Sequence, residues 1–188
     1  MIGSLKRWLQ REKDGAARRI EEMGLKSGAG LAARLLGEQL DDERLHRWQI
    51  ETLSAFLDRL IHDPDGDLPR ASDIGAADAC ADFIAKLPAP RVAQLSHVLA
   101  VFEAGSLVLG GDYPRKRFSR LDPAPQDAYI EGWSKSALPQ RRTIFAALKS
   151  IGGIGYWSRP STWPAIGYSI DENPGVPTHA RSAPDTDS

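Results

Sequence analysis

Apolar residues recur three or four positions apart in several separate stretches of the chain, which predicts amphipathic helices. The clearest stretch begins near Leu45 and ends before His62-Asp63-Pro64. We find no segment that alternates apolar and polar residues or is rich in β-branched residues, as a strand would be. The pattern therefore predicts an all-α fold. The apolar stripe of the clearest helix is formed by Ile50, Leu53, Leu57, Leu60 and Ile61.

Two further helices are predicted on either side of Pro88-Ala89-Pro90. Ser72 or Asp73 can cap the first of them, and the prolines end it and start the second. The second is expected to stop by Gly110-Gly111, since glycine is common just after a helix. The apolar faces are Ala76, Cys80, Phe83, Ile84 and Leu87 in the first helix, and Val92, Leu95, Val98, Leu99 and Phe102 in the second.

Proline in the first turn predicts two more helices, one starting at Asp122-Pro123 and one at Leu138-Pro139. In the earlier helix, Tyr129 and Trp133 are four residues apart, so their side chains lie on one face. The later helix has an apolar face of its own. That face consists of Ile144, Phe145, Leu148 and Ile151.

Three glycines leave the length of this last helix open. Gly152, Gly153 and Gly155 together would cost about 3 kcal/mol in a helix interior relative to alanine. Either the helix ends at these glycines, or it continues to Trp157 and another part of the backbone packs closely against them.

Length and composition indicate one domain with two flanking segments. A chain of 188 residues, 41% hydrophobic and 26% charged, is typical of a globular protein with a single core. We expect a compact domain of about five to six helices in residues 43–168, preceded by a charged helical arm in residues 1–42. Residues 169–188 contain three prolines and no aromatic residue, which predicts a disordered tail.

The charge balance argues against nucleic acid or an anionic membrane as the main partner, because the net charge is −1 and the pI is about 6.4. The longest stretches without charged residues have about eleven residues, short of the roughly 20 that span a bilayer. The start of the charged arm differs from the rest of the chain in this respect. Its apolar face is flanked by cations, as in helices that lie on the surface of a membrane. We expect any peripheral membrane contact in residues 1–20. The apolar residues of this face are Ile2, Leu5, Trp8 and Leu9.

Residue types that often carry chemistry occur without the neighbours that the chemistry needs. Cys80, the only cysteine, lies on an apolar stripe and is expected to be a core residue. The sequence Gly28–Ala33 matches a GxGxxA dinucleotide fingerprint, but a charged helical segment rather than a strand precedes it. The loop Asp63–Arg70 resembles the start of a calcium loop, yet Leu68 stands where an EF-hand needs glycine. The four histidines form no metal-binding pair. We therefore predict no catalytic, cofactor-binding or metal-binding residue.

The stretch from Arg117 to Tyr168 contains more than half of the chain's fourteen aromatic residues. Aromatic side chains beside glycines and cations are typical of a surface that packs closely, either on the chain's own core or on another protein. This stretch is the candidate partner interface. Its candidate residues are Arg117, Phe118, Arg120, Trp133, Arg141, Arg142, Tyr156, Trp157, Trp163 and Tyr168.

A series of short motifs runs through roughly residues 45–168. They are Pro69–Asp78, Leu109-Gly110-Gly111, Arg117–Leu121, Gly132-Trp133-Ser134, Leu138–Arg142, Phe145–Lys149, Tyr156-Trp157 and Trp163–Tyr168. Together they resemble the gluconate 2-dehydrogenase subunit 3 type of small subunit. A similar helical segment precedes some long-chain alcohol oxidases of the glucose-methanol-choline (GMC) flavoprotein class.

This resemblance implies a non-catalytic accessory subunit of a separate, FAD-dependent GMC-type alcohol or sugar dehydrogenase. Such a subunit supports the folding, stability or assembly of the large flavoprotein subunit. FAD and the catalytic histidines are then expected on that partner, and this chain would have no cofactor of its own. Ile20-Glu21-Glu22 directly follows Arg18-Arg19, so a clean twin-arginine export signal is missing. We therefore expect a cytoplasmic location, with a periplasmic one, together with the partner, as the alternative.

Two other functions remain open on the residues alone. One is a stand-alone enzyme with an unrecognised pocket. The other is a helical protein that binds nucleic acid through the basic loop from Arg115 to Arg120. The charge balance of the whole chain favours a partner other than nucleic acid.

Overall fold

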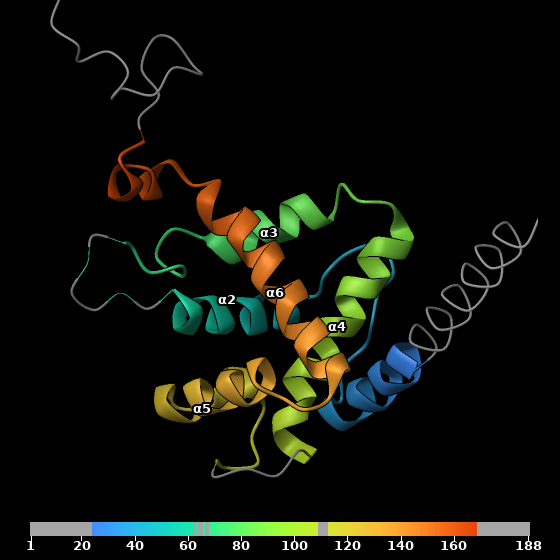
Figure 1. Cartoon of the computed structure of the whole chain (residues 1–188). Helices are drawn as coiled ribbons and strands as arrows, with labels where there is room; N and C mark the ends of the chain where they lie inside the picture. The colour runs from blue at the N-terminus through green and yellow to red at the C-terminus, as the bar shows by residue number, and fades with distance from the viewer. Residues whose placement is uncertain (1–23, 62, 64–65, 67, 109–112, 169–188) are drawn as a thin grey trace, which may run out of the picture.

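The regular structure of this chain is helical throughout the part that can be described. The computed structural model describes residues 24–61, 63, 66, 68–108 and 113–168 (Figure 1), and no strand occurs in these ranges. The predicted all-α class is confirmed. Besides helical residues 24–36, the elements are α2 (Arg47–Leu60), α3 (Ala76–Ile84), α4 (Ala89–Val108), η1 (Phe118–Arg120), α5 (Pro123–Ser134), α6 (Pro139–Trp157), η2 (Pro160–Thr162) and η3 (Pro164–Ile166), where η marks a 3-10 helix.

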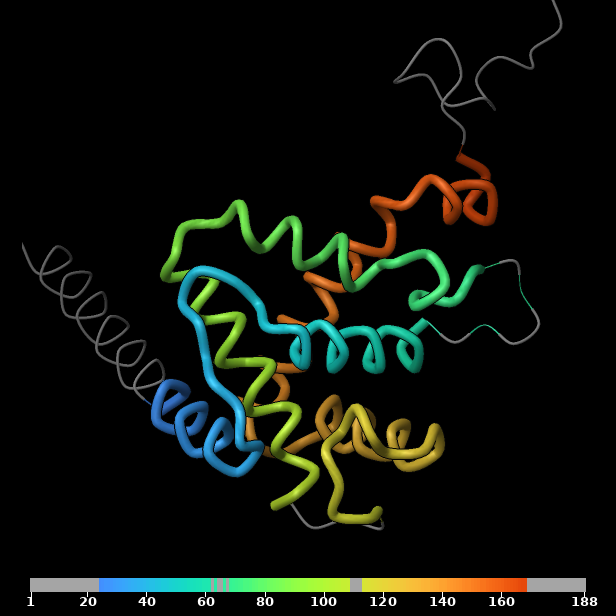
Figure 2. Tube along the Cα trace, turned by 180° about the vertical axis from the view of Figure 1, so that it is seen from behind, coloured from blue at the N-terminus to red at the C-terminus, as the bar shows by residue number. Residues whose placement is uncertain are grey.

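Helix α6 lies across the other helices and contacts α2, α3, α4 and α5. In the view of Figure 1 it runs diagonally over α2, α3 and α4, and no other described element lies in front of it. Figure 2, the view from behind, shows residues 24–46 and α4 on the opposite side of the molecule. One side of α6 therefore faces the core, and the other faces solvent.

Prolines start three of these helices where the sequence predicts. Helix α5 begins at Pro123 and α6 at Pro139, each with proline in the first turn, and α4 begins at Ala89. Asp122 occupies the N-cap position of α5, although its side chain makes no capping hydrogen bond. The fixed φ of proline, rather than a side-chain cap, thus sets the start of α5.

The centre of the core is aromatic, and Phe102 of α4 is its hub. The Phe102 ring centroid lies 4.7 Å from that of Phe118 and 5.1 Å from those of Tyr129 and Trp133. Phe56 of α2 completes the group at 5.5 Å. These pairs adopt edge-to-face arrangements, which the ring quadrupoles favour. The Tyr129 hydroxyl donates to the Phe102 carbonyl at 2.6 Å, so its one polar atom is satisfied inside the core.

Helix α6 continues through its three glycines to Trp157, and two of them, Gly152 and Gly155, lie where other elements pack against the helix. A Cβ atom at Gly155 would lie 2.1 Å from the Cys80 sulfur and 2.5 Å from the Ala76 carbonyl oxygen of α3. At Gly152 it would lie 2.3 Å from a methyl group of Leu57 in α2. Close packing against α3 and α2 thus offsets the low helix propensity of glycine.

The predicted cap of α3 is wrong. The helix begins at Ala76, with Gly75 as its N-cap in the left-handed conformation at φ +62°, and not at Ser72 or Asp73. The Ser72 amide instead donates to the Asp58 carboxylate at 2.8 Å, so this residue belongs to a turn anchored on α2. The Arg159 guanidinium donates to the Gly75 carbonyl at 2.6 Å and lies where a side chain at position 75 would project. Glycine relieves both the backbone strain and the crowding.

The described part of the N-terminal arm packs on α4. Ala29, Ala32 and Leu36 form a small cluster with Ala100 and Ala104. Small side chains on both helices allow their backbones to approach closely. The predictions for residues 1–20 and for the tail 169–188 lie outside the described residues, as do Gly110-Gly111 and two aspartates of the calcium-like loop.

Candidate partner-binding surface

Three of the candidate interface residues lie in the chain's own core. Phe118, Trp133 and Tyr156 are at most 2% exposed. The Tyr156 hydroxyl also donates to the Pro69 carbonyl at 2.8 Å, which fastens the end of α6 to the turn before α3. In this fold these three aromatic residues pack inside the domain and do not reach its surface.

Arg117 bonds within the chain. Its guanidinium donates to the Glu38 carboxylate at 2.8 Å and to the Leu36 carbonyl oxygen. Leu36 is the last of helical residues 24–36, and Glu38 lies just beyond them. A cation is favourable near the carbonyl end of a helix, where the backbone dipole is negative. Arg117 therefore connects the described part of the arm to the turn at η1.

A buried carboxylate lies beneath the same turn. Glu103 of α4 is 1% exposed and accepts two hydrogen bonds from Ser119, one from the amide at 3.1 Å and one from the hydroxyl at 2.6 Å. Burial raises the pKa of Glu103 above its ordinary value, while the bonds from Ser119 and the nearby charge of Arg117 lower it. The sequence reasoning missed this residue. The available signal was a glutamate four residues after Leu99, on an otherwise apolar face.

The pKa of Glu103 predicts a component of the pH dependence of stability. Because burial dominates and raises this pKa above 4.5, the folded chain holds the proton more tightly than the unfolded chain. Stability from this group is therefore fully present below pH 4.5 and is lost as pH rises through the folded-state pKa. The variant Glu103→Gln, which still accepts a bond from Ser119, should lack this component. Chemical unfolding of both proteins over a pH series measures it, and a pH-independent difference would contradict the expectation.

The remaining aromatic candidates form an ordered C-terminal hook, residues 157–168, which contains η2 and η3. The Trp163 ring nitrogen donates to the Trp157 carbonyl at 3.0 Å, and the Trp163 and Tyr168 rings lie 5.4 Å apart, edge to face. Trp157 is 42% exposed, and Trp163 and Tyr168 are half-buried. The hook projects beyond the packed helices at the upper left of Figure 1.

Apolar side chains that the sequence reasoning did not select extend this surface. Ile154, one turn before Trp157 on α6, is 45% exposed, and Ile166 of η3 is 56% exposed. No pattern in the sequence separates them from core residues, because Ile151 belongs to the same helix and is buried. The exposed apolar surface therefore runs from the last turns of α6 into the hook.

The candidate arginines outside the core differ in how they are held. Arg141 lies over the Trp133 ring, with its guanidinium carbon 5.8 Å from the centroid. Arg142 donates to the Ser136 carbonyl at 2.5 Å, and both Arg142 and Arg120 are exposed. Arg141 thus covers the core, whereas Arg142 and Arg120 present charge to solvent.

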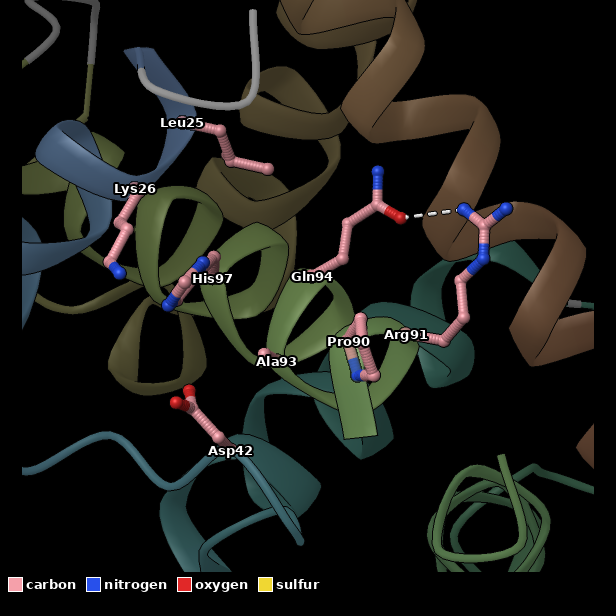
Figure 3. A pocket seen from close by; sticks show the side chains of 8 residues that line it. All are labelled: Leu25, Lys26, Asp42, Pro90, Arg91, Ala93, Gln94 and His97. Carbon is pink, nitrogen blue, oxygen red and sulfur yellow. Dashed lines mark hydrogen bonds between the residues drawn. The ribbon is translucent and has the colours of Figure 1, made fainter. Parts of the chain in front are cut away.

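A hollow of about 480 Å³ lies between the described arm and the start of α4 (Figure 3). Its charged lining residues are Lys26, Asp42, Arg91 and His97. Burial lowers the pKa of His97, Asp42 raises it and Lys26 lowers it. Figure 3 shows Arg91 turned toward Gln94, to which it donates at 2.9 Å, and away from Lys26 and His97. The charged groups therefore do not converge on one ligand position.

Cys80 is a core residue, as its place on an apolar stripe predicts. It is completely buried, and its sulfur lies 3.3 Å from the Ile151 carbonyl oxygen, which accepts its hydrogen bond. Burial raises the pKa of the thiol to about 11. Within the described residues, no group of three or more His, Cys, Asp or Glu side chains could hold a metal ion. The GxGxxA sequence Gly28–Ala33 lies inside helical residues 24–36.

The buried thiol should react slowly. With a pKa of about 11, only about one Cys80 side chain in 10⁴ is ionised at neutral pH, and the thiolate is the reactive form. We expect a maleimide reagent to label the folded protein far more slowly than the same protein in denaturant. Time-resolved labelling with mass spectrometry measures both rates, and immediate labelling of the folded chain would contradict the expectation.

Among the described residues, no helix is both long enough and apolar enough to cross a membrane. Comparisons of the chain with protein-family models, with curated proteins and with solved structures found no match. The motifs in the sequence and the exposed surface at the end of α6 are therefore the observations on which a function can be proposed.

Proposed function

We propose that this chain is a non-catalytic accessory subunit of an FAD-dependent GMC-type alcohol or sugar dehydrogenase, and that it supports folding, stability or assembly of the large flavoprotein subunit. The resemblance of the motifs suggests the class of partner, and the structural observation that supports a partner-binding role is the exposed apolar surface formed by Ile154, Trp157 and Ile166. Under this proposal FAD is bound by the partner, and this chain is not catalytic alone. It resides with its partner, in the cytoplasm or, as the alternative, in the periplasm.

This surface includes two of the motifs through which the chain resembles the small subunits. The motifs Tyr156-Trp157 and Trp163–Tyr168 contain its exposed and half-buried aromatic residues. Large aromatic side chains in ordered positions contribute much binding energy per residue at protein interfaces, because little conformational entropy is lost when they bind. The Trp163–Trp157 hydrogen bond and the Trp163–Tyr168 ring contact hold these side chains in position in the chain without a partner.

Co-expression with a large GMC-type flavoprotein, to be sought first in the neighbouring reading frames, tests the proposal. We expect a stable yellow complex, and a lower yield or melting temperature of the flavoprotein when it is expressed alone. The variant Trp157→Ala should weaken the complex while the isolated chain stays folded. Leu35→Ala, which removes another exposed apolar side chain, in helical residues 24–36 and outside α6 and the hook, is the matched control.

Two results would contradict the proposal. One is a wild-type chain that remains a monodisperse monomer in the presence of the flavoprotein. The other is a cofactor or turnover found in the isolated chain, which would favour a stand-alone enzyme.

A further inference from the structure

Charge is distributed unevenly along this chain. Residues 132–168 contain five cationic residues, Lys135, Arg141, Arg142, Lys149 and Arg159, and no Asp or Glu. Since the whole chain has a net charge of −1, the rest of it has a net charge of −6. Helix α6 therefore belongs to a positively charged segment of a slightly acidic protein.

The cations of α6 align with its exposed tryptophan. Arg142, Ala146, Lys149, Gly153 and Trp157 follow one another at spacings of four, three, four and four residues, which places them on one side of a helix. We refer to these five residues as the α6 stripe. All are exposed except Gly153, which is half-buried, and they lie on the solvent side of the helix that crosses the front of Figure 1.

The charges of the α6 stripe have no carboxylate partner in the described part of the chain. The ion pairs found among the described residues all involve cations outside the stripe, namely Arg44, Arg47, Arg59, Arg70, Arg117 and Lys135. Arg142 also lies in the first turn of α6, where the helix dipole disfavours a cation. Arg142 donates to the neutral Ser136 carbonyl, so an external anionic surface would supply the counter-charge that both Arg142 and Lys149 lack.

Small residues alternate with the long side chains of the stripe and allow a partner to approach the helix between them. Ala146 and Gly153 separate the long side chains, so the helix surface is low between them. A Cβ atom at Gly153 would meet only the Trp157 ring, at 4.0 Å, and thus the indole lies against the helix near this glycine. The stripe combines two cations, a small residue after each of them, and a flat aromatic ring at one end.

We propose that the α6 stripe is the docking surface for an acidic patch on the partner protein; this inference rests on the proposed function above. A rise of 1.5 Å per residue places Arg142 and Lys149 about 10 Å apart along the helix, and Trp157 about 12 Å beyond Lys149. The partner surface should therefore present carboxylates about 10 Å apart and an apolar recess about 12 Å further on. The exposed apolar residues of the hook continue the interface beyond Trp157.

This arrangement separates the roles of charge and of the tryptophan. Exposed charges at an interface mainly accelerate association and make it sensitive to salt. A large aromatic side chain in an apolar recess mainly slows dissociation. Changes at Arg142 and Lys149 should thus alter the association rate, and a change at Trp157 should alter the dissociation rate.

The test measures association of the purified chain with the purified flavoprotein by stopped-flow fluorescence over a range of salt concentrations. The double variant R142E/K149E should associate about tenfold more slowly or worse at low salt and should lose most of the salt dependence. The matched control is R44E/R47E, which reverses two exposed arginines outside α6 and should stay within about twofold of wild type. Circular dichroism verifies folding, and the single variant K149E serves if the double variant unfolds.

The outcomes distinguish this inference from the function on which it rests. If the wild-type chain and the flavoprotein form no complex, the proposed function fails and the inference falls with it. If a complex forms and R142E/K149E associates as fast as wild type, only the inference is overturned. If the wild-type chain binds phosphatidylserine vesicles through these two cations while flavoprotein association is unchanged in the variant, the α6 stripe binds a membrane, which also overturns the inference.

Discussion

Replacing Gly155 with alanine is expected to destabilise the fold by about 2 kcal/mol or more, even though alanine is the better helix former. The added methyl group would lie 2.1 Å from the Cys80 sulfur and 2.5 Å from the Ala76 carbonyl oxygen. The carbonyl belongs to the backbone of α3, so α3 and α6 must move apart to relieve the clash. Overpacking of this kind typically costs about 1–3 kcal/mol and sometimes more, which exceeds the roughly 1 kcal/mol gained in helix propensity.

The neighbouring glycine supplies the matched control for this prediction. Gly153 lies two residues earlier in the same helix, and a methyl group there would meet only the Trp157 ring at 4.0 Å. Gly153→Ala should therefore stabilise the chain by up to about 1 kcal/mol. Denaturant unfolding of the two variants gives both free energies, and equal effects at the two positions would show that helix propensity, not packing against α3, decides the outcome.

Replacing Trp133 with alanine should cost roughly 3–5 kcal/mol of folding stability. The side chain is 2% exposed, its ring lies 5.1 Å from that of Phe102, and Arg141 covers its outer face. Its removal leaves a cavity beside Phe102 at the aromatic centre, and the structure around such a cavity typically relaxes only in part. Thermal and denaturant unfolding of the isolated chain measure the loss.

Trp157→Ala is the comparison that distinguishes core from surface. Trp157 is 42% exposed, so we expect the free energy of unfolding of the isolated chain to change by less than about 1 kcal/mol. Its effect should appear instead in the stability of the complex with the partner. A similar loss of stability for both tryptophan variants would place Trp157 in the core and weaken the proposed interface.

The helices could be predicted from the sequence because their signals are local. Apolar spacing and first-turn prolines depend on a few neighbouring residues, and they placed α2, α4, α5 and α6 close to their observed positions. The start of α3 depends on distant groups. Asp58 of α2 bonds the Ser72 amide, and Arg159 lies beside Gly75, so tertiary contacts determine which residue caps the helix. Residues 58 and 159 are not part of any local pattern around residue 72.

The candidate site was harder to predict, because burial depends on how the helices pack. Tyr156 and Trp157 are adjacent in sequence, yet the first is completely buried and the second is 42% exposed. Helix α6 turns Tyr156 toward the turn before α3 and Trp157 toward solvent, and this orientation depends on the contacts of Gly152 and Gly155. The glycine cluster was visible in the sequence, but its packing partners were not.

The bonds at the end of α6 connect the hook to the middle of the chain. The Tyr156 hydroxyl donates to the Pro69 carbonyl, and the Arg159 guanidinium donates to the Gly75 carbonyl. Pro69 and Gly75 lie on either side of the turn that leads into α3. Segments joined in this way tend to unfold locally as one cooperative unit. A ligand that binds only the folded form of such a unit shifts its opening equilibrium toward the closed state. A partner bound at the hook would therefore also protect the start of α3 from local unfolding, some eighty residues earlier in the sequence.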